Sequence, residues 1–129
     1  LIADKIQKYT WDDKKPTAQM LGRWQPWHNG HQKLFEEIIK KTGQVNIMVR
    51  DVKGIGDNPF DFETVKKNIE IALKDFKNRI KISLVPNITN ICYGRGVGYK
   101  IEEIVLSQDI QEISATKIRK KMREEGKLK

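Results

Sequence analysis

The stretch from Leu21 to His31, with the sequence LGRWQPWHNGH, limits the possible folds of this 129-residue chain most strongly, and it contains both histidines. A glycine directly after an apolar run, then a proline and two histidines three residues apart, predicts a strand, a tight loop and the first turn of a helix. The unpaired N–H groups and the dipole at such a helix start hold anions such as phosphate. His28 and His31 are at positions i and i+3, so both imidazoles can face one phosphate group if the helix begins near residue 28.

Further along the chain, the hydrophobic pattern alternates between strands and helices, which predicts a right-handed, doubly wound α/β domain. The expected sheet is parallel and Rossmann-like, with about five strands and helices on both faces. Strands are expected at residues 17–21, 45–49, 80–84, 91–93 and 101–106. The strand at 80–84 carries a lysine between apolar residues, which is typical of a sheet edge.

Amphipathic helices are expected at residues 32–42 and 62–76 and from Ser114 onward. Gly43 is expected to end the first helix, because glycine adopts the left-handed conformation of a helix C-terminus at little steric cost. Asp61 and Ser114 are expected to cap the N-termini of the second and third helices.

Two motifs in this pattern resemble those of the nucleotidyltransferase superfamily. The first is His28-Asn29-Gly30-His31, and the second is Ile113-Ser114-Ala115-Thr116-Lys117-Ile118-Arg119, which follows later in the chain. Residues 22–28 are most similar to the archaeal-type nicotinamide mononucleotide adenylyltransferases, whereas the short length is closer to the glycerol-3-phosphate cytidylyltransferase type. Both branches remain open at this point.

The resemblance implies transfer of a nucleoside monophosphate from ATP or CTP to a small phosphorylated acceptor, with release of pyrophosphate. Catalysis of this kind needs positioning and charge stabilisation rather than a covalent nucleophile. The expected catalytic residues are His28, His31 and Arg119, which would donate hydrogen bonds to the phosphates. The residues expected to bind the nucleotide and its phosphates are Gly22, Arg23, Trp24, Gly30, Ser114 and Thr116. Mg²⁺ is the implied cofactor, held mainly by phosphates and water, with no side chain predicted as a ligand.

Four residues are candidates for binding the acceptor. Arg50 and Asp51 follow the second strand, and ligands of an open parallel sheet bind beyond the carboxyl ends of the strands. Tyr93 and Arg95 lie in a glycine-rich stretch that could approach the nucleotide closely. The same glycines could instead form a flexible turn without a ligand.

Three residues near the histidines also allow a purely structural interpretation. Trp24 and Trp27 can pack in the core rather than stack on a base, and Arg23 can form a surface ion pair. A structural zinc site is disfavoured, because the two histidines and the single cysteine, Cys92, are too few to complete it.

The net charge of +8 is concentrated at the C-terminus, where residues 116–129 hold seven Lys or Arg and two Glu. Such a segment can bind nucleic acid, or it can be the solvated face of a helix. The absence of aromatic residues in it disfavours a nucleic-acid partner. Besides the predicted enzyme, two functions stay open: adenylation of a different anion, and a nucleotide- or nucleic-acid-binding module on the same fold without turnover.

We expect a single domain over residues 1–129, with a lead-in segment at 1–16 and a basic tail at 120–129. The chain has no apolar run of ~20 residues, and no signal peptide is visible, so a cytoplasmic protein without a membrane partner is expected. Cys92 lies between apolar residues and is expected to be a small buried side chain. Because the chain begins with Leu1 rather than Met, a missing fused domain is possible. A homo-oligomer is a separate possibility.

Overall fold

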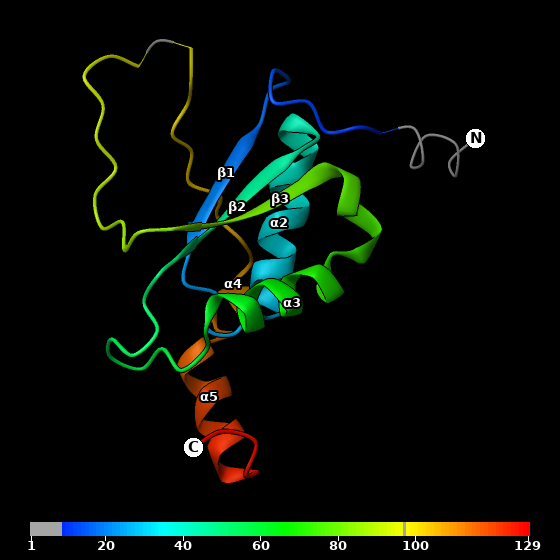
Figure 1. Ribbon diagram of the computed structural model, residues 1–129. Coiled ribbons are helices and arrows are strands. Elements are labelled where there is room, and N and C mark those ends of the chain that lie inside the picture. The colour runs from blue at the N-terminus through cyan, green and yellow to red at the C-terminus, as the bar shows by residue number, and fades with distance from the viewer. Residues whose placement is uncertain (1–8, 97) are drawn as a thin grey trace.

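The computed structural model describes residues 9–96 and 98–129 (Figure 1). The first half of the expected lead-in, residues 1–8, lies outside the described residues. In chain order the elements are β1 (Ala18–Gly22), α2 (Asn29–Thr42), β2 (Val45–Arg50), α3 (Phe62–Ala72), a 3-10 helix (Lys74–Arg79), β3 (Ile80–Val85), α4 (Gln108–Gln111) and α5 (Ala115–Glu124). The alternation of strands and helices is that of the predicted α/β class.

The strands form one parallel sheet in the order β1-β2-β3. Met20 of β1 pairs with Ile47 of β2, which pairs in turn with Ile82 of β3. Within the described part of the chain, β3 has a strand neighbour on one side only, which confirms the prediction of an edge strand.

The core lies on one face of this sheet. Val45, Ile47 and Val49 alternate along β2 and are all buried, whereas the residues between them are partly exposed. They form one cluster with buried side chains of α2 and α3, among them Phe35 and Ile69. Both long helices therefore cover the same face.

The predicted placement of helices on both faces is not found in residues 9–96 and 98–129. Two right-handed crossovers that advance in the same direction across a parallel sheet place their helices on the same face. The order β1-β2-β3 contains two such steps, through α2 and then α3. Doubly wound topology would need further strands beyond β1, where the direction reverses.

The expected count of about five strands is not confirmed either. Residues 91–93 and 101–106 are not part of any strand; they belong to a long irregular segment between β3 and α4, which we call the arm (residues 86–96 and 98–107). The arm runs out from the end of β3 and returns to α4 (Figure 1). Ile91, Ile101 and Val105 are more than half exposed, whereas Ile104 is partly buried and packs against the core. Neither apolar run pairs with a strand among the described residues.

Cys92 also lies in the arm and is exposed, so the prediction of a buried cysteine was wrong. Its apolar neighbours are exposed as well, and they do not supply the burial that the local sequence suggested.

The three predicted caps are confirmed, whereas the helix expected at residues 62–76 ends at Ala72 and is followed by the 3-10 helix. Gly43 follows α2 with φ 83°, and its N–H donates to the Ile39 carbonyl at 2.8 Å. Asp61 caps α3 by accepting a hydrogen bond from the Thr64 N–H at 2.9 Å. Ser114 caps α5 through the Lys117 N–H at 3.4 Å. These caps occupy backbone groups that have no partner inside the helix.

The described part of the lead-in is irregular and is attached to the sheet through Gln44, which is fully buried before β2. The Gln44 side chain accepts a hydrogen bond from Tyr9 Oη at 3.0 Å and donates to the Asp12 carbonyl at 2.8 Å. Among the described residues, no helix combines the length and apolar character that crossing a bilayer requires.

Candidate functional site

The two histidines lie at the N-terminus of α2. This helix begins at Asn29, three residues before the start of the predicted helix at 32–42. His28 is the N-cap residue, and its Nδ1 accepts hydrogen bonds from the N–H groups of Gly30 at 3.0 Å and His31 at 3.4 Å. His31 Nδ1 in turn accepts from the His28 N–H at 3.1 Å. This is the reciprocal capping box that a serine and a glutamate form in other helices, here built from two imidazoles.

The capping bonds determine where the imidazole protons lie. A nitrogen that accepts a hydrogen bond carries no proton, so each neutral ring must carry its hydrogen on Nε2. The rings stack with centroids 3.6 Å apart and planes inclined by 16°. Within the described residues, neither Nε2 has a hydrogen-bond partner. The pair therefore presents two neutral N–H donors at a helix start, an arrangement suited to an anion.

Burial keeps both imidazoles neutral. Removal from water, and to a lesser degree the neighbouring His28, lowers the pKa of His31 to about 3. Burial also lowers the pKa of His28, partly opposed by a hydrogen bond within its own residue. The lowered pKa of each histidine disfavours its charged form, so the donors at neutral pH are imidazoles rather than imidazolium ions.

Two tryptophans supply much of this burial. The Trp24 ring meets His31 edge to face with centroids 4.7 Å apart, and Trp27 lies 5.5 Å from the same imidazole. Trp24 is only 6% exposed, and its Nε1 donates to the Met48 carbonyl at 3.2 Å. This position favours packing over stacking for Trp24; contact with a nucleotide stays a prediction.

The two glycines of the stretch make room for rings. A Cβ atom on Gly22 would lie 2.7 Å from the Trp24 ring, and one on Gly30 would lie 2.8 Å from His28 Cε1. Gly30 thus allows the His28 imidazole to fold back over the first turn of α2. Both glycines were predicted to bind the nucleotide; in this structure their demonstrable role is to place side chains.

The second motif forms the start of α5, where buried Arg119 donates three hydrogen bonds. Its Nε donates to Asp57 Oδ2 at 2.8 Å, its Nη1 to the Gln25 carbonyl at 2.6 Å and its Nη2 to Thr116 Oγ1 at 3.3 Å. Arg119 and Thr116 do lie on one face of the helix, as their spacing predicted.

Gln25 joins the two motifs and was missed by sequence reasoning. Besides its carbonyl bond to Arg119, its side chain donates from Nε2 to the Phe60 carbonyl and accepts from the Phe60 N–H, both at 2.9 Å. Gln25 is 4% exposed, so the loop before α2, the loop before α3 and α5 meet at a buried polar contact. No local pattern marks such a residue, because its partners are distant in sequence.

Asp57 was also missed. Its carboxylate binds Arg119 and also Arg123, whose Nη2 donates to Oδ1 at 2.6 Å. Hydrogen bonds from Arg123 and Arg119 hold the pKa of Asp57 well below its usual range. Two features of the sequence together could have identified it. Asp57 is an acidic residue in the loop after the second strand, and the end of the chain is strongly basic.

The four acceptor candidates separate into two pairs. Arg50 and Asp51 line a small cavity of about 10 Å³ together with Gln25, so they do lie beside the loop that carries the histidines. Arg50 Nη2 donates to Asn87 Oδ1 at 2.8 Å, and its buried Nε has no hydrogen-bond partner among the described residues.

Tyr93 and Arg95 lie in the arm, where both are exposed and contact Tyr99. The structure does not bring them to the histidines. Farther along the arm, Glu102 pairs with Lys41 at the C-terminal end of α2, 3.5 Å apart, opposite the end that His28 caps. Arg23 is exposed beside the site.

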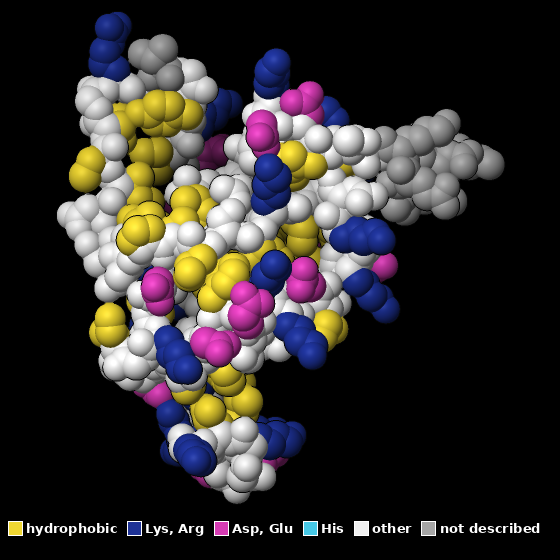
Figure 2. Space-filling model, in the orientation of Figure 1, with side chains coloured by type: hydrophobic (Ala, Val, Ile, Leu, Met, Phe, Trp, Pro, Cys, Tyr) yellow, Lys and Arg dark blue, Asp and Glu magenta, His cyan; other side chains and the backbone are white. Residues whose placement is uncertain are grey.

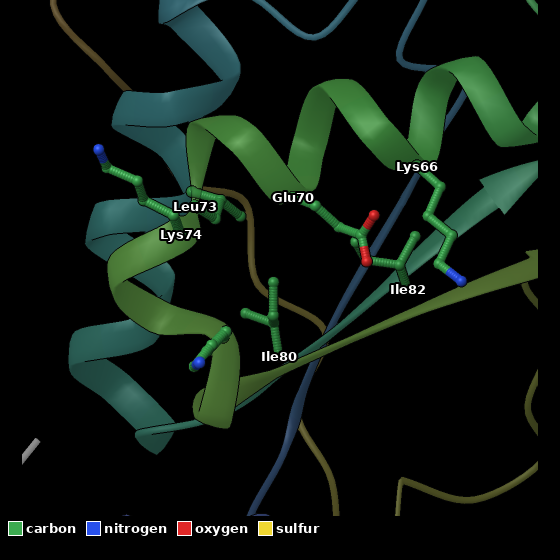
Figure 3. A pocket seen from close by; sticks show the side chains of 7 residues that line it. Lys66, Glu70, Leu73, Lys74, Ile80 and Ile82 are labelled. Carbon is green, nitrogen blue, oxygen red and sulfur yellow. The ribbon is translucent and has the colours of Figure 1, made fainter. Parts of the chain in front are cut away.

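A larger hollow of about 300 Å³ lies between α3 and β3. Ile80 and Ile82 of β3 and Lys66 and Glu70 of α3 point into it (Figure 3). None of the predicted site residues lines it, so it is separate from the candidate site.

The part of the chain that the structure describes contains no group of three or more His, Cys, Asp or Glu side chains placed to hold a metal ion. Besides the Asp57 carboxylate, the ionisable side chains described at the two motifs are imidazole and guanidinium groups, whose N–H donors bind anions.

Comparison with known proteins gives a partial match. No family model matches the chain. Over 62 residues it is 34% identical to a nicotinamide-nucleotide adenylyltransferase from Methanococcus aeolicus. The aligned segment is 46% of this chain and 34% of that protein, so the chain spans about a third of the length of the curated relative it matches. This similarity supports a nucleotidyltransferase-like relationship.

Proposed function

We propose that this chain transfers a nucleoside monophosphate from a nucleoside triphosphate to a small phosphorylated acceptor and releases pyrophosphate. The observation that carries the proposal is the stacked His28 and His31 pair, whose capping bonds leave two neutral Nε2–H donors at the start of α2. The partial similarity to an adenylyltransferase supports it independently.

The proposed role of the imidazoles is electrostatic. Attack on the α-phosphorus moves charge onto its nonbridging oxygens and onto the leaving pyrophosphate. A donor placed where this charge develops lowers the barrier, and removing one such donor typically costs ~3 kcal/mol. Because His28 and His31 are neutral and held by backbone bonds, they can donate without first losing or gaining a proton.

Mg²⁺ belongs to the proposal as an ion carried by the phosphates. The imidazole and guanidinium groups of the site fit the phosphates themselves, and Mg²⁺ commonly keeps several waters while binding phosphate oxygens. When bound, it would neutralise part of the phosphate charge.

ATP is the first nucleotide to test, since the matched relative is named an adenylyltransferase, and CTP is the second. For the acceptor, Arg50 and Asp51 are the better candidates because both lie beside Gln25, in the loop that carries the histidines. Tyr93 and Arg95 would need the arm to approach the histidines from a different position.

A pyrophosphate-release assay tests the proposal. Each of ATP, CTP, GTP and UTP is incubated with Mg²⁺ and with nicotinamide mononucleotide or glycerol 3-phosphate as the acceptor. We expect release that requires both a nucleotide and an acceptor. No release from any pair, together with no nucleotide-dependent rise in melting temperature, would contradict the proposal.

The basic C-terminus favours a second candidate, a binding module without turnover. Lys and Arg side chains gather around α5 (Figure 2). Binding of generic DNA or RNA that weakens steeply with salt, without pyrophosphate release, would support this candidate.

A further inference from the structure

Two arginines of α5 converge on one carboxylate. Arg123 donates from Nη2 to Asp57 Oδ1 at 2.6 Å and from Nη1 to Oδ2 at 3.2 Å, while Arg119 Nε donates to the same Oδ2 at 2.8 Å. Three charge-assisted hydrogen bonds to one small anion form the geometry in which guanidinium groups also hold phosphate.

The arginines form a single face because they are four residues apart in α5, one turn of the helix. Arg119 is the inner member, with an 8% exposed side chain, and Arg123 is the outer member at 39%. Asp57 itself is 42% exposed. The carboxylate therefore sits where an anion from solvent would meet both guanidinium groups.

A hydrogen bond from Arg119 connects the arginine pair to the loop that leads to the histidines. Arg119 Nη1 donates to the carbonyl of Gln25, three residues before His28, and its Nη2 donates to Thr116 in the first turn of α5. An anion held by the arginines would thus lie beside the loop that leads to the imidazoles. In a triphosphate, that place suits the phosphates beyond the reacting one.

Asp57 reaches the arginines from an exposed loop. The loop between β2 and α3 extends to the start of α5 (Figure 1), and both glycines before Asp57, Gly54 and Gly56, have positive φ. Buried Asn58 anchors the loop behind Asp57, because its Nδ2 donates to the Ile55 carbonyl at 2.5 Å. The carboxylate can therefore be exchanged for another anion without breaking a helix or a strand.

We propose that Arg123 joins Arg119 in holding the outer phosphates of the nucleotide, and that the Asp57 carboxylate occupies both guanidinium groups until a phosphate displaces it. This inference rests on the proposed function and adds to it a binding residue, Arg123, and a competing internal anion, Asp57. A polyphosphate carries more charge and more acceptor oxygens than one carboxylate, so it displaces Asp57 from both arginines.

Binding of inorganic tripolyphosphate tests the proposal by calorimetry, with no need for turnover. Asp57→Asn removes the competing charge and should bind tripolyphosphate about tenfold more tightly than the parent, because a neutral amide competes less well than a carboxylate for the two guanidinium groups. Glu63→Gln is the matched control: it removes one exposed acidic charge in the first turn of α3 and should leave affinity unchanged.

Arg123→Gln should weaken tripolyphosphate binding several-fold, whereas Lys120→Gln, an exposed cation on the same helix, should not. Equal or weaker binding by folded Asp57→Asn would overturn the proposal, because Asp57 would then only orient the arginines. If Asp57→Asn does not fold, the test relies on Arg123→Gln. Unchanged tripolyphosphate affinity of this variant would overturn the proposal. Tight tripolyphosphate binding without any pyrophosphate release would contradict the proposed enzymatic function but would still support this phosphate-binding site.

Discussion

At the scale of single residues, the capping role of the imidazoles makes protonation costly. A proton on Nδ1 of His31 would face the His28 N–H, which is now its donor at 3.1 Å. Burial adds to this cost, and the pKa of His31 lies at about 3. The unfolded chain has no such restriction and takes up the proton near the usual histidine pKa of about 6.5.

The free energy of unfolding should therefore fall as pH decreases from about 6.5 toward 3, because the unfolded state then binds a proton that the folded state does not. Urea unfolding of the parent and of His31→Asn, at pH 7.0, 5.5 and 4.5, measures this. Asparagine retains an acceptor near the Nδ1 position but does not titrate, so the variant should lose less stability over this range. Equal losses in both proteins would show that His31 is not held neutral.

The sequence predicted the position of these residues better than their surroundings. The spacing of His28, Gly30 and His31 was enough to place both imidazoles at a helix start. Their tautomer and lowered pKa depend on Trp24 and Trp27, whose packing is a property of the folded chain. Asp57 and Gln25 could not be predicted from local patterns, because their contacts with Arg119 join residues far apart in sequence.

At the scale of elements, the junction between β1 and α2 depends on close packing of Trp24 over Gly22. Gly22→Ala would place a Cβ atom 2.7 Å from a ring that is itself buried. Overpacking of this kind typically costs 1–3 kcal/mol, so we expect a loss of about 2 kcal/mol in urea unfolding. Gly94→Ala is the control, since no heavy atom of the described residues lies within 4 Å of the added methyl group. A neutral Gly22→Ala would contradict the packing described for Trp24.

The contact between the two loops gives a second prediction for the elements. Gln25→Ala leaves the Phe60 N–H and carbonyl without their side-chain partners, each bond now 2.9 Å long. Leaving a buried polar group unpaired costs about 1–3 kcal/mol, so for two groups we expect a loss of roughly 2–6 kcal/mol in urea unfolding. Gln108→Ala, an exposed glutamine in α4, should change stability far less. Similar stability in both variants would mean that Gln25 does not hold the loops together.

Hydrophobic periodicity predicted the elements that bury one apolar face. It gave wrong predictions for segments whose apolar side chains are mostly exposed. Strands β1 to β3 and helices α2 and α3 were located to within a few residues, since each places apolar side chains at its proper period in one core. Helix α5 was located from its Ser114 cap instead. The apolar runs at 91–93 and 101–106 were mistaken for strands because strand propensity says nothing about whether a pairing partner exists. The face that each helix covers follows from strand order, which no local pattern reveals.

At the scale of the whole molecule, the positive charge of the C-terminus divides into two parts. Arg119 and Arg123 are bound to Asp57, whereas Lys120 and Lys121 are exposed and Lys127 pairs with Glu125 at 3.3 Å on the surface. The expectation of a solvated basic tail thus applies to the lysines but not to Arg123.

Replacing Lys120, Lys121, Lys127 and Lys129 together by glutamine should leave turnover within a few fold at physiological salt. The Debye length there is ~8 Å, so exposed charges beyond the Asp57 contact act only weakly on the phosphates. Turnover and polynucleotide affinity should be measured on the same four-fold variant. Tight polynucleotide binding by the parent that disappears in the variant would favour the binding module instead.

The central claim is that the Nε2–H donors of His28 and His31 act on the phosphates during transfer, and one measurement tests it most directly. Pyrophosphate release is compared between the parent, His28→Asn and His31→Asn, with the nucleotide and acceptor pair that the parent uses. Asparagine caps helices well and preserves an acceptor near Nδ1, but it has no group at the position of Nε2. We predict that turnover falls about 10²- to 10³-fold in each variant, while the melting temperature changes little. Turnover within a few fold of the parent in both folded variants would contradict the claim.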